Sequence, residues 1–145
     1  MPILKPISGH TSCYGPYRYL TKGGRALACD YINLANPDLE NPHSVFNWAR
    51  VMDATRRRLR NDEPWRGKRV RTYKHYIISP DPGDAIPLAV LQDLALAWAR
   101  RHFPDHEVAI VYHDDNARGI PHAHVVVNNA NVVDGRRLQD PDRAL

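Results

Sequence analysis

The sequence predicts an α+β fold, in which helices pack on one face of a central, mainly antiparallel β-sheet and a metal site lies on that sheet. Two observations lead to this prediction. Two segments with helical periodicity are interspersed among four segments with the composition of strands. The last two strand-like segments, 108–113 and 121–129, are joined by a short polar turn, which is typical of an antiparallel pair. With 145 residues, the chain is expected to form a single domain with one core.

The N-terminal third contains one predicted strand. Residues 1–8 have the composition of a short strand. Residues 14–34 are rich in tyrosine and are interrupted by Gly23 and Gly24, so no regular element is assigned to them. Prolines and acidic residues between 37 and 42 indicate a loop.

The two predicted helices follow. Ser44 is a suitable N-cap, and apolar residues at helical spacing predict a helix over 45–60. Asp84 is expected to cap a second helix over 85–102, with Pro87 tolerated in its first turn.

The remaining strands complete the sheet. Between the two helices, residues 70–79 are rich in β-branched and aromatic side chains and predict a strand. Segments 108–113 and 121–129 are apolar on both faces, which is typical of central strands.

Composition and charge limit the function. No apolar run approaches the roughly 20 residues of a membrane span, and no signal peptide opens the chain, so no membrane insertion is expected and the cytoplasm is the expected location. The formal net charge of +4 favours a polyanionic partner, and positive residues are concentrated between 56 and 71. This cluster is either a solvated surface or a surface for the phosphate backbone of a nucleic acid. On the second interpretation, the expected DNA contacts are Arg56, Arg57, Arg60, Arg66, Lys68, Arg69 and Arg71.

The clearest indication of function is a group of histidines around the last turn. Because side chains alternate along a strand, His122 and His124 are expected on one face, and His113 can join them from the neighbouring strand. Three neutral imidazoles leave coordination positions open and keep the full charge of a divalent cation, which suits a phosphodiester substrate. Asp114 and Asp115 are placed to orient an imidazole or to act as a base.

Histidines on strands can also serve the fold alone. Isolated histidines on strands are more often surface or core residues than ligands. His75 lies on the predicted strand 70–79, and its expected role is to support the cluster indirectly or to serve the fold.

The histidine pattern resembles that of the relaxases, the mobilisation nucleases of conjugative and mobilisable plasmids, within the wider His-hydrophobic-His endonucleases. In that family a histidine and a few acidic or polar residues precede a His-hydrophobic-His strand that ends in asparagine. Here residues 113–115 and 121–128 match this motif, and residues 72–79 are similar to the family's strand before its long helix.

The resemblance implies a tyrosine nucleophile near the N-terminus. Tyr19, in the segment Tyr-Leu-Thr followed by Lys-Gly-Gly-Arg, matches the family best. Tyr17 and Tyr31 are the alternatives. Asp115, Arg18 or Arg25 are candidates to help the phenol ionise, with Asp115 acting as a base.

The resemblance also implies the cofactor, the reaction and the partners. A divalent cation would be held by His113, His122 and His124, with Mn²⁺ or Mg²⁺ in use and Zn²⁺ or Ni²⁺ as other occupants of the site. The reaction would be nicking and religation of single-stranded DNA at an origin of transfer, through a 5′-phosphotyrosine link. Accessory mobilisation proteins and a coupling protein are the further partners implied.

Besides a metal hydrolase of a small phosphodiester, against which the basic cluster argues weakly, two other functions stay open. One is a replication initiator or transposase of the same superfamily, although replication initiators usually carry their tyrosine after the histidine motif. The other is a DNA-binding relaxase fragment without activity. Relaxases commonly continue beyond the histidine strand, so the chain is expected to be a fragment, a small stand-alone member or a decayed copy, with a frayed tail over 134–145.

Overall fold

The computed structural model describes residues 3–35, 46–64, 70–116 and 118–138. A five-stranded antiparallel sheet forms the centre, in the order β1-β3-β5-β4-β2. The strands are β1 (Ile3–Gly9), β2 (Ala28–Ile32), β3 (Tyr73–Ser79), β4 (His106–His113) and β5 (His122–Asn131). The helices are α1 (Tyr14–Thr21), α2 (Trp48–Arg58) and α3 (Leu88–His102). Two short 3₁₀ turns, η1 (Lys22–Gly24) and η2 (Pro82–Asp84), complete the described elements.

The sheet confirms the predicted central strands. β5 lies in the middle of the sheet between β3 and β4. Every residue of β4 is buried, as are all residues of β5 except the first and the last. These strands are apolar on both faces because both faces of the sheet are covered.

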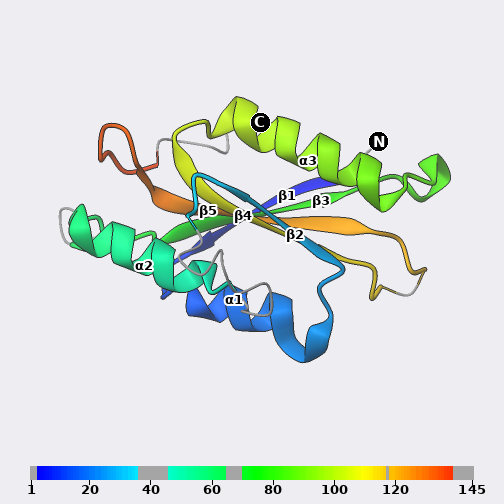
Figure 1. Cartoon of the computed structure of the whole chain (residues 1–145), viewed down its shortest axis with the longest axis horizontal. Coiled ribbons are helices and arrows are strands. Elements are labelled where there is room, and N and C mark those ends of the chain that lie inside the picture. The colour runs from blue at the N-terminus through cyan, green and yellow to red at the C-terminus, as the bar shows by residue number, and fades with distance from the viewer. Residues whose placement is uncertain (1–2, 36–45, 65–69, 117, 139–145) are drawn as a thin grey trace.

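The helices lie on both faces of the sheet, so the expectation of helices on one face only is wrong (Figure 1). Leu91 and Ala95 of α3 pack against Tyr76 and Val125 on one face. Leu20 of α1 and Met52 of α2 belong to a second core with the β-strand residues Val111 and Val126 on the other.

Two elements were missed in the sequence because their local signals are weak. α1 contains Gly15 and Pro16, which the helix accommodates in its first turn, where a proline costs no hydrogen bond. β2 has an acidic residue, Asp30, among its five positions and gains its order from pairing with β4, with Ala28 opposite Tyr112.

The helix starts differ from the predicted ones. α3 begins at Leu88 rather than 85, because 82–84 form a 3₁₀ turn and Ala85 adopts a left-handed backbone with φ of 46°. Asp84 therefore ends that turn and does not cap α3. The N-cap of α2 is Asn47, whose side chain accepts a hydrogen bond from the Arg50 amide at 3.1 Å, while Ser44 lies outside the described residues.

Residues 134–138 belong to the tail expected to fray, and the end of this segment contacts the core. Leu138 is buried in the core under α3, and its amide donates to the Asn129 side chain at 2.7 Å. Arg71 donates to the Leu138 carbonyl at 2.7 Å. Within the described ranges, none of the helices combines the length and the apolar character needed to cross a membrane.

Candidate metal centre

Three histidines meet at one end of the sheet, as predicted. β4 and β5 pair so that His113 lies opposite His122, and His124 lies opposite Val111. One ring nitrogen from each histidine lies within 4.8 Å of those of the other two. The cluster is on the face that α1 covers, because His113 reaches a backbone carbonyl of that helix. The three histidines could together hold a metal ion.

The two ring nitrogens of His113 differ in their hydrogen bonding. Its Nε2 donates to the Leu20 carbonyl oxygen at 2.7 Å, since a carbonyl can only accept. Its Nδ1 is buried and has no hydrogen-bond partner among the described residues. Burial lowers the pKa of His113, so the ring is neutral and Nδ1 presents a lone pair. A buried polar atom without a partner costs free energy, and a metal ion would remove that cost.

His124 is oriented by a fourth histidine. Its Nδ1 lies 2.9 Å from Nε2 of His75 on β3. Burial, together with neighbouring imidazoles, lowers the pKa of His124 to about 3 and that of His75 to about 4, so both rings are neutral at pH 7. One ring must then donate and the other accept. When His124 donates from Nδ1, its Nε2 is a lone pair that a cation can use.

His122 completes the cluster from the start of β5. Its Nδ1 lies 3.2 Å from the Ile120 carbonyl oxygen and 3.5 Å from the Asn116 side-chain nitrogen. An Nδ1–H bond to the carbonyl leaves Nε2 for a metal. All three donor atoms are imidazole nitrogens, which suit Mn²⁺, Zn²⁺ and Ni²⁺. The residues present therefore fit a divalent cation.

Two contacts connect the segment that carries Tyr19 with residues in and next to this cluster. The next residue in the chain, Leu20, accepts the hydrogen bond from His113. The Arg25 guanidinium carbon lies 4.9 Å from the centroid of the Tyr19 ring, and Arg25 also donates to the Tyr19 carbonyl at 2.9 Å. The side chain of Tyr19 is 61% exposed, so its hydroxyl is accessible to a large substrate.

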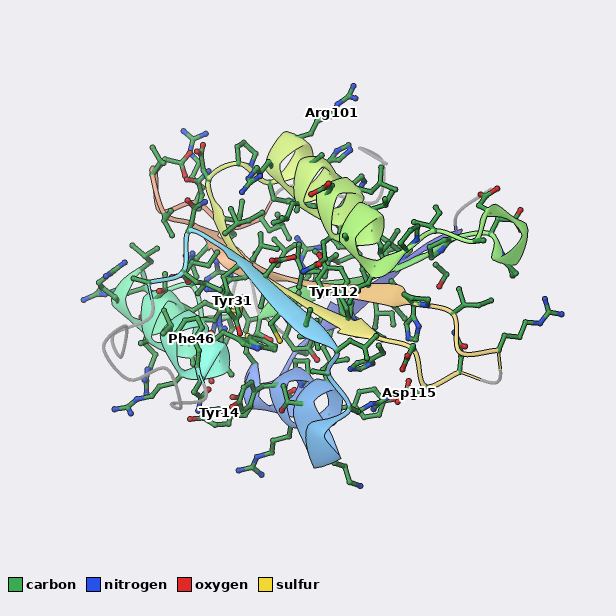
Figure 2. The ribbon with its side chains drawn as sticks, turned by 45° about the vertical axis from the view of Figure 1, so that its right-hand side comes forward. Tyr14, Tyr31, Phe46, Arg101, Tyr112 and Asp115 are labelled. Atoms are coloured by element: carbon green, nitrogen blue, oxygen red, sulfur yellow. The ribbon has the colours of Figure 1, made fainter. Side chains whose placement is uncertain are left out.

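Asp115 is held by the same arginine. Arg25 donates to its carboxylate at 2.8 Å and forms an ion pair with it at 2.7 Å. Burial alone would raise the pKa of Asp115, but the hydrogen bond from Arg25 and the charges of Arg25 and His113 together outweigh burial and lower the pKa. A carboxylate with a lowered pKa is a weaker base. Figure 2 shows Tyr14 and Asp115 on opposite sides of α1.

The other two candidate tyrosines are packed in the protein. Tyr17 is half-buried, with its ring edge-on to Trp48 at 5.4 Å, and burial raises its pKa. Tyr31 packs edge-on to Phe46 at 4.8 Å, and burial raises its pKa as well. Tyr31 pairs with Ala109, four residues along β4 from His113, or roughly 13 Å at the usual strand rise. The structure therefore does not bring Tyr31 to the histidines.

Apart from Arg56, the basic residues predicted to contact DNA divide into three groups. Arg57 and Arg60 are exposed on or just after α2. Arg71 is half-buried and donates to the Leu138 carbonyl. The residues Arg66, Lys68 and Arg69 lie outside the described residues.

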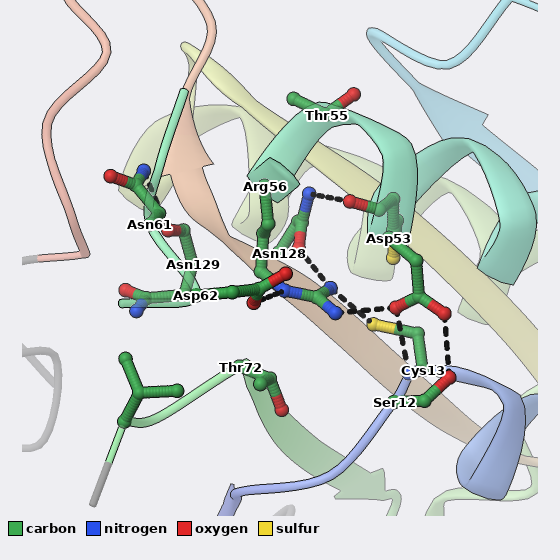
Figure 3. A network of polar contacts seen from close by, with 12 residues as sticks. Ser12, Cys13, Asp53, Thr55, Arg56, Asn61, Asp62, Thr72, Asn128 and Asn129 are labelled. Atoms are coloured by element: carbon green, nitrogen blue, oxygen red, sulfur yellow. Dashed lines mark hydrogen bonds and ion pairs between the residues drawn. The ribbon is translucent and has the colours of Figure 1, made fainter. Parts of the chain in front are cut away.

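Arg56 differs from the sequence expectation because it is buried, with 2% of its surface exposed. Its guanidinium forms ion pairs with Asp53 and Asp62 and donates to the Asn128 side chain at 2.9 Å and to Cys13 Sγ at 3.1 Å (Figure 3). The positive charge of Arg56 is thus paired inside the protein, and its contacts connect α2 to β5 and to the start of α1. The guanidinium is not available to a phosphate backbone.

Replacing Arg56 with methionine should lower the free energy of unfolding by about 3–5 kcal/mol, because it leaves two carboxylates without their buried partner. Urea unfolding followed by circular dichroism measures the change. Arg57→Met is the matched control, since this neighbour is exposed and should change stability by less than about 0.5 kcal/mol. Equal midpoints for the two variants would contradict the structural role of Arg56.

The sequence did not identify two groups that contact the histidines, the carbonyl of Leu20 and the side chain of Asn116. The Leu20 carbonyl carries no side-chain signal, and its contact with His113 joins positions 93 residues apart. Asn116 was part of the polar turn, but its position beside His122 depends on how the turn folds.

Most of the sequence matches one known protein family. The family model described as relaxase, MobA/VirD2-like, nuclease domain matches residues 27–144, whereas no curated protein matches the chain. The matched region contains the three clustered histidines and Tyr31, and it begins after Tyr17 and Tyr19. Because the match covers most of the sequence, the chain belongs to the relaxase family, as a MobA/VirD2-like nuclease domain.

Proposed function

We propose that this domain nicks and rejoins single-stranded DNA at an origin of transfer, using a divalent metal ion and Tyr19 as the nucleophile. The observation that carries the proposal is the environment of His113. One nitrogen of this ring is fixed by the carbonyl of Leu20, next to Tyr19 in the chain, and the other is buried without a described partner in the histidine cluster. This contact supports the proposal because it ties the segment that carries Tyr19 to one of the proposed metal ligands.

Each residue near the cluster has a proposed role. A divalent cation held by His113, His122 and His124 would polarise the scissile phosphate, with Mn²⁺ or Mg²⁺ as the ion in use. The phenolic oxygen of Tyr19 attacks phosphorus and loses its proton. The bond from phosphorus to the 3′ oxygen breaks, and that oxygen takes up a proton. The products are a 5′-phosphotyrosine and a free 3′-hydroxyl, and the same bonds re-form in the reverse direction.

Arg25 and Asp115 position the nucleophile in this proposal. Arg25 contacts both the ring and the carbonyl of Tyr19, and Asp115 holds Arg25 in place. The guanidinium also supplies positive charge beside the position of the phosphate. Accessory mobilisation proteins and a coupling protein would act with the domain in the cytoplasm.

The direct test is to look for the covalent product. The protein is incubated with Mn²⁺ and single-stranded oligonucleotides tiled across the DNA that flanks its gene, and adducts that survive denaturation are mapped by mass spectrometry. We expect an adduct on Tyr19 that EDTA prevents. Cleavage without any adduct would instead indicate hydrolysis by water. DNA binding without cleavage would favour the inactive DNA-binding alternative.

A second candidate is a replication initiator or transposase of the same superfamily. It would give the same kind of adduct at a different DNA site. The position of Tyr19 before the histidine motif favours the relaxase. The tiled oligonucleotides distinguish these functions, because cleavage would occur at a replication origin or an element end rather than at an origin of transfer.

His75 should control the affinity for the metal without binding it. Replacing His75 with alanine removes the acceptor for His124 Nδ1, and Mn²⁺ affinity measured by calorimetry should fall about 10- to 100-fold. His75→Glu, which restores an acceptor, should recover much of the loss. His10→Ala is the control, because His10 is exposed and bonds the Val70 carbonyl away from the cluster. Equal affinity for all variants would show that His75 does not orient His124.

A further inference from the structure

A second hollow lies on the same face of the protein as the histidine cluster. It has a volume of about 720 Å³, in the range of pockets that hold small ligands. Its walls come from the chain after β1, the start of α1 and the outer side of α2. We call it the α1–α2 pocket, and its lining includes Tyr14, the arginines Arg50, Arg56 and Arg57, and the aspartates Asp53 and Asp62.

Two arginines make the rim of the α1–α2 pocket positive. Arg50 and Arg57 are both exposed and are separated by about two turns of α2, so they lie on the same side of the helix. Neither forms an ion pair with a described residue, whereas the pocket's third arginine, Arg56, is paired with Asp53 and Asp62. Three arginines and two aspartates leave a net positive charge in the pocket.

The carboxylate on the floor of the α1–α2 pocket already has hydrogen-bond partners. The carboxylate of Asp53 accepts hydrogen bonds from Ser12 Oγ at 2.5 Å, from the Cys13 amide at 3.0 Å and from Arg56. This negative charge is therefore compensated and does not repel an anion at the rim. The arrangement separates a neutralised interior from two cations that face solvent.

An aromatic ring stands at the edge of the α1–α2 pocket. Tyr14 is half-buried, and its hydroxyl accepts a hydrogen bond from Asn47 at 3.0 Å. Its ring also makes an edge contact with Tyr17 at 6.1 Å, and the Arg18 guanidinium lies 5.7 Å from its centroid. A ring fixed in this way offers a platform for a nucleobase at little cost in side-chain entropy.

We propose that the α1–α2 pocket binds a nucleotide of the substrate strand away from the scissile phosphate, with its base against Tyr14 and the adjoining phosphates on Arg50 and Arg57. This inference rests on the proposed function. α1 connects the two sites, since Tyr14 lies at the pocket and Leu20 contacts His113. The six steps between them rise roughly 9 Å, and a stacked strand advances about 3.4 Å per nucleotide, so a few nucleotides join the sites.

The test measures binding without nicking. A fluorescently labelled dodecamer of thymidine, (dT)₁₂, is titrated with the protein in EDTA at several salt concentrations, and anisotropy gives the dissociation constant. The double variant Arg50→Gln/Arg57→Gln should bind about tenfold more weakly. Its slope of log affinity against log salt should be smaller by about 1.4, or about 0.7 for each phosphate that an arginine no longer neutralises. Arg101→Gln is the control, because Arg101 projects from the outer side of α3 on the opposite face (Figure 2).

A crosslink locates the bound strand independently. A (dT)₁₂ strand containing 5-iododeoxyuridine is irradiated with the protein, and the crosslinked peptide should contain Tyr14. If the double variant and Arg101→Gln bind (dT)₁₂ as the wild type does, the inference is overturned while the proposed function stands. If wild-type protein does not bind (dT)₁₂ at all, the inference also fails, while the adduct test still decides the proposed function separately. Thymidine monophosphate that competes at concentrations close to the (dT)₁₂ dissociation constant would overturn the strand assignment in favour of a free nucleotide.

Discussion

Replacing His124 with alanine should lower the affinity for Mn²⁺ by more than about 100-fold and abolish nicking. Loss of a residue that only hydrogen-bonds a metal ligand typically lowers metal affinity 10- to 100-fold, and loss of a ligand itself lowers the affinity further. His124 is central to the cluster, since its ring centroid lies 4.7 Å from that of His113 and 5.0 Å from that of His122. Calorimetry with Mn²⁺ and a cleavage assay measure the two effects together.

The control for His124 separates metal binding from folding. His10→Ala removes an exposed histidine and should leave Mn²⁺ affinity at the wild-type value. Both variants should keep a cooperative thermal transition in EDTA, where the metal makes no contribution. Unchanged Mn²⁺ affinity in a folded His124→Ala protein would mean that the histidine cluster is not the metal site.

Replacing Tyr19 with phenylalanine should remove the covalent adduct and lower the rate of nicking by several orders of magnitude, because the nucleophilic oxygen is lost. The ring that contacts Arg25 remains, so Mn²⁺ affinity and DNA affinity should be unchanged. Denaturing gels measure the adduct, and anisotropy measures DNA binding. This combination distinguishes a lost nucleophile from a damaged site.

Tyr17→Phe and Tyr31→Phe are the matched variants. Both should still form the adduct, because Tyr17 packs on Trp48 and Tyr31 packs on Phe46 away from the histidines. The opposite result, an adduct in Tyr19→Phe that is missing in Tyr31→Phe, would place the nucleophile on β2. That result would agree with the region matched by the family model, which contains Tyr31.

The sequence predicted the histidine site well because the site is local. His122 and His124 share a face through the alternation of a strand, and a short turn brings His113 beside them. The same local rule identified β4 and β5 as central strands. His75 was recognised only as a neighbour, since its contact with His124 depends on the pairing of β3 with β5.

What the sequence could not predict depends on contacts between distant segments. Both faces of the sheet are covered because α3 packs on one face and α1 and α2 pack on the other, although the sequence of α1 is a weak helix former. Arg56 looked like its basic neighbours in the charge pattern. Its burial depends on Cys13 and Asn128, which are 43 and 72 residues away in the chain.

The contacts at the two ends of α1 have a consequence for how the domain holds Tyr19, the proposed nucleophile. A helix of eight residues is too short to persist alone in water. Asp53 binds the chain at the start of α1 through Ser12 and Cys13, and His113 binds Leu20 near its end. The helix therefore depends on the contacts at both of its ends to stay folded. Damage to either is expected to misplace Tyr19 and slow the reaction while leaving its chemistry intact.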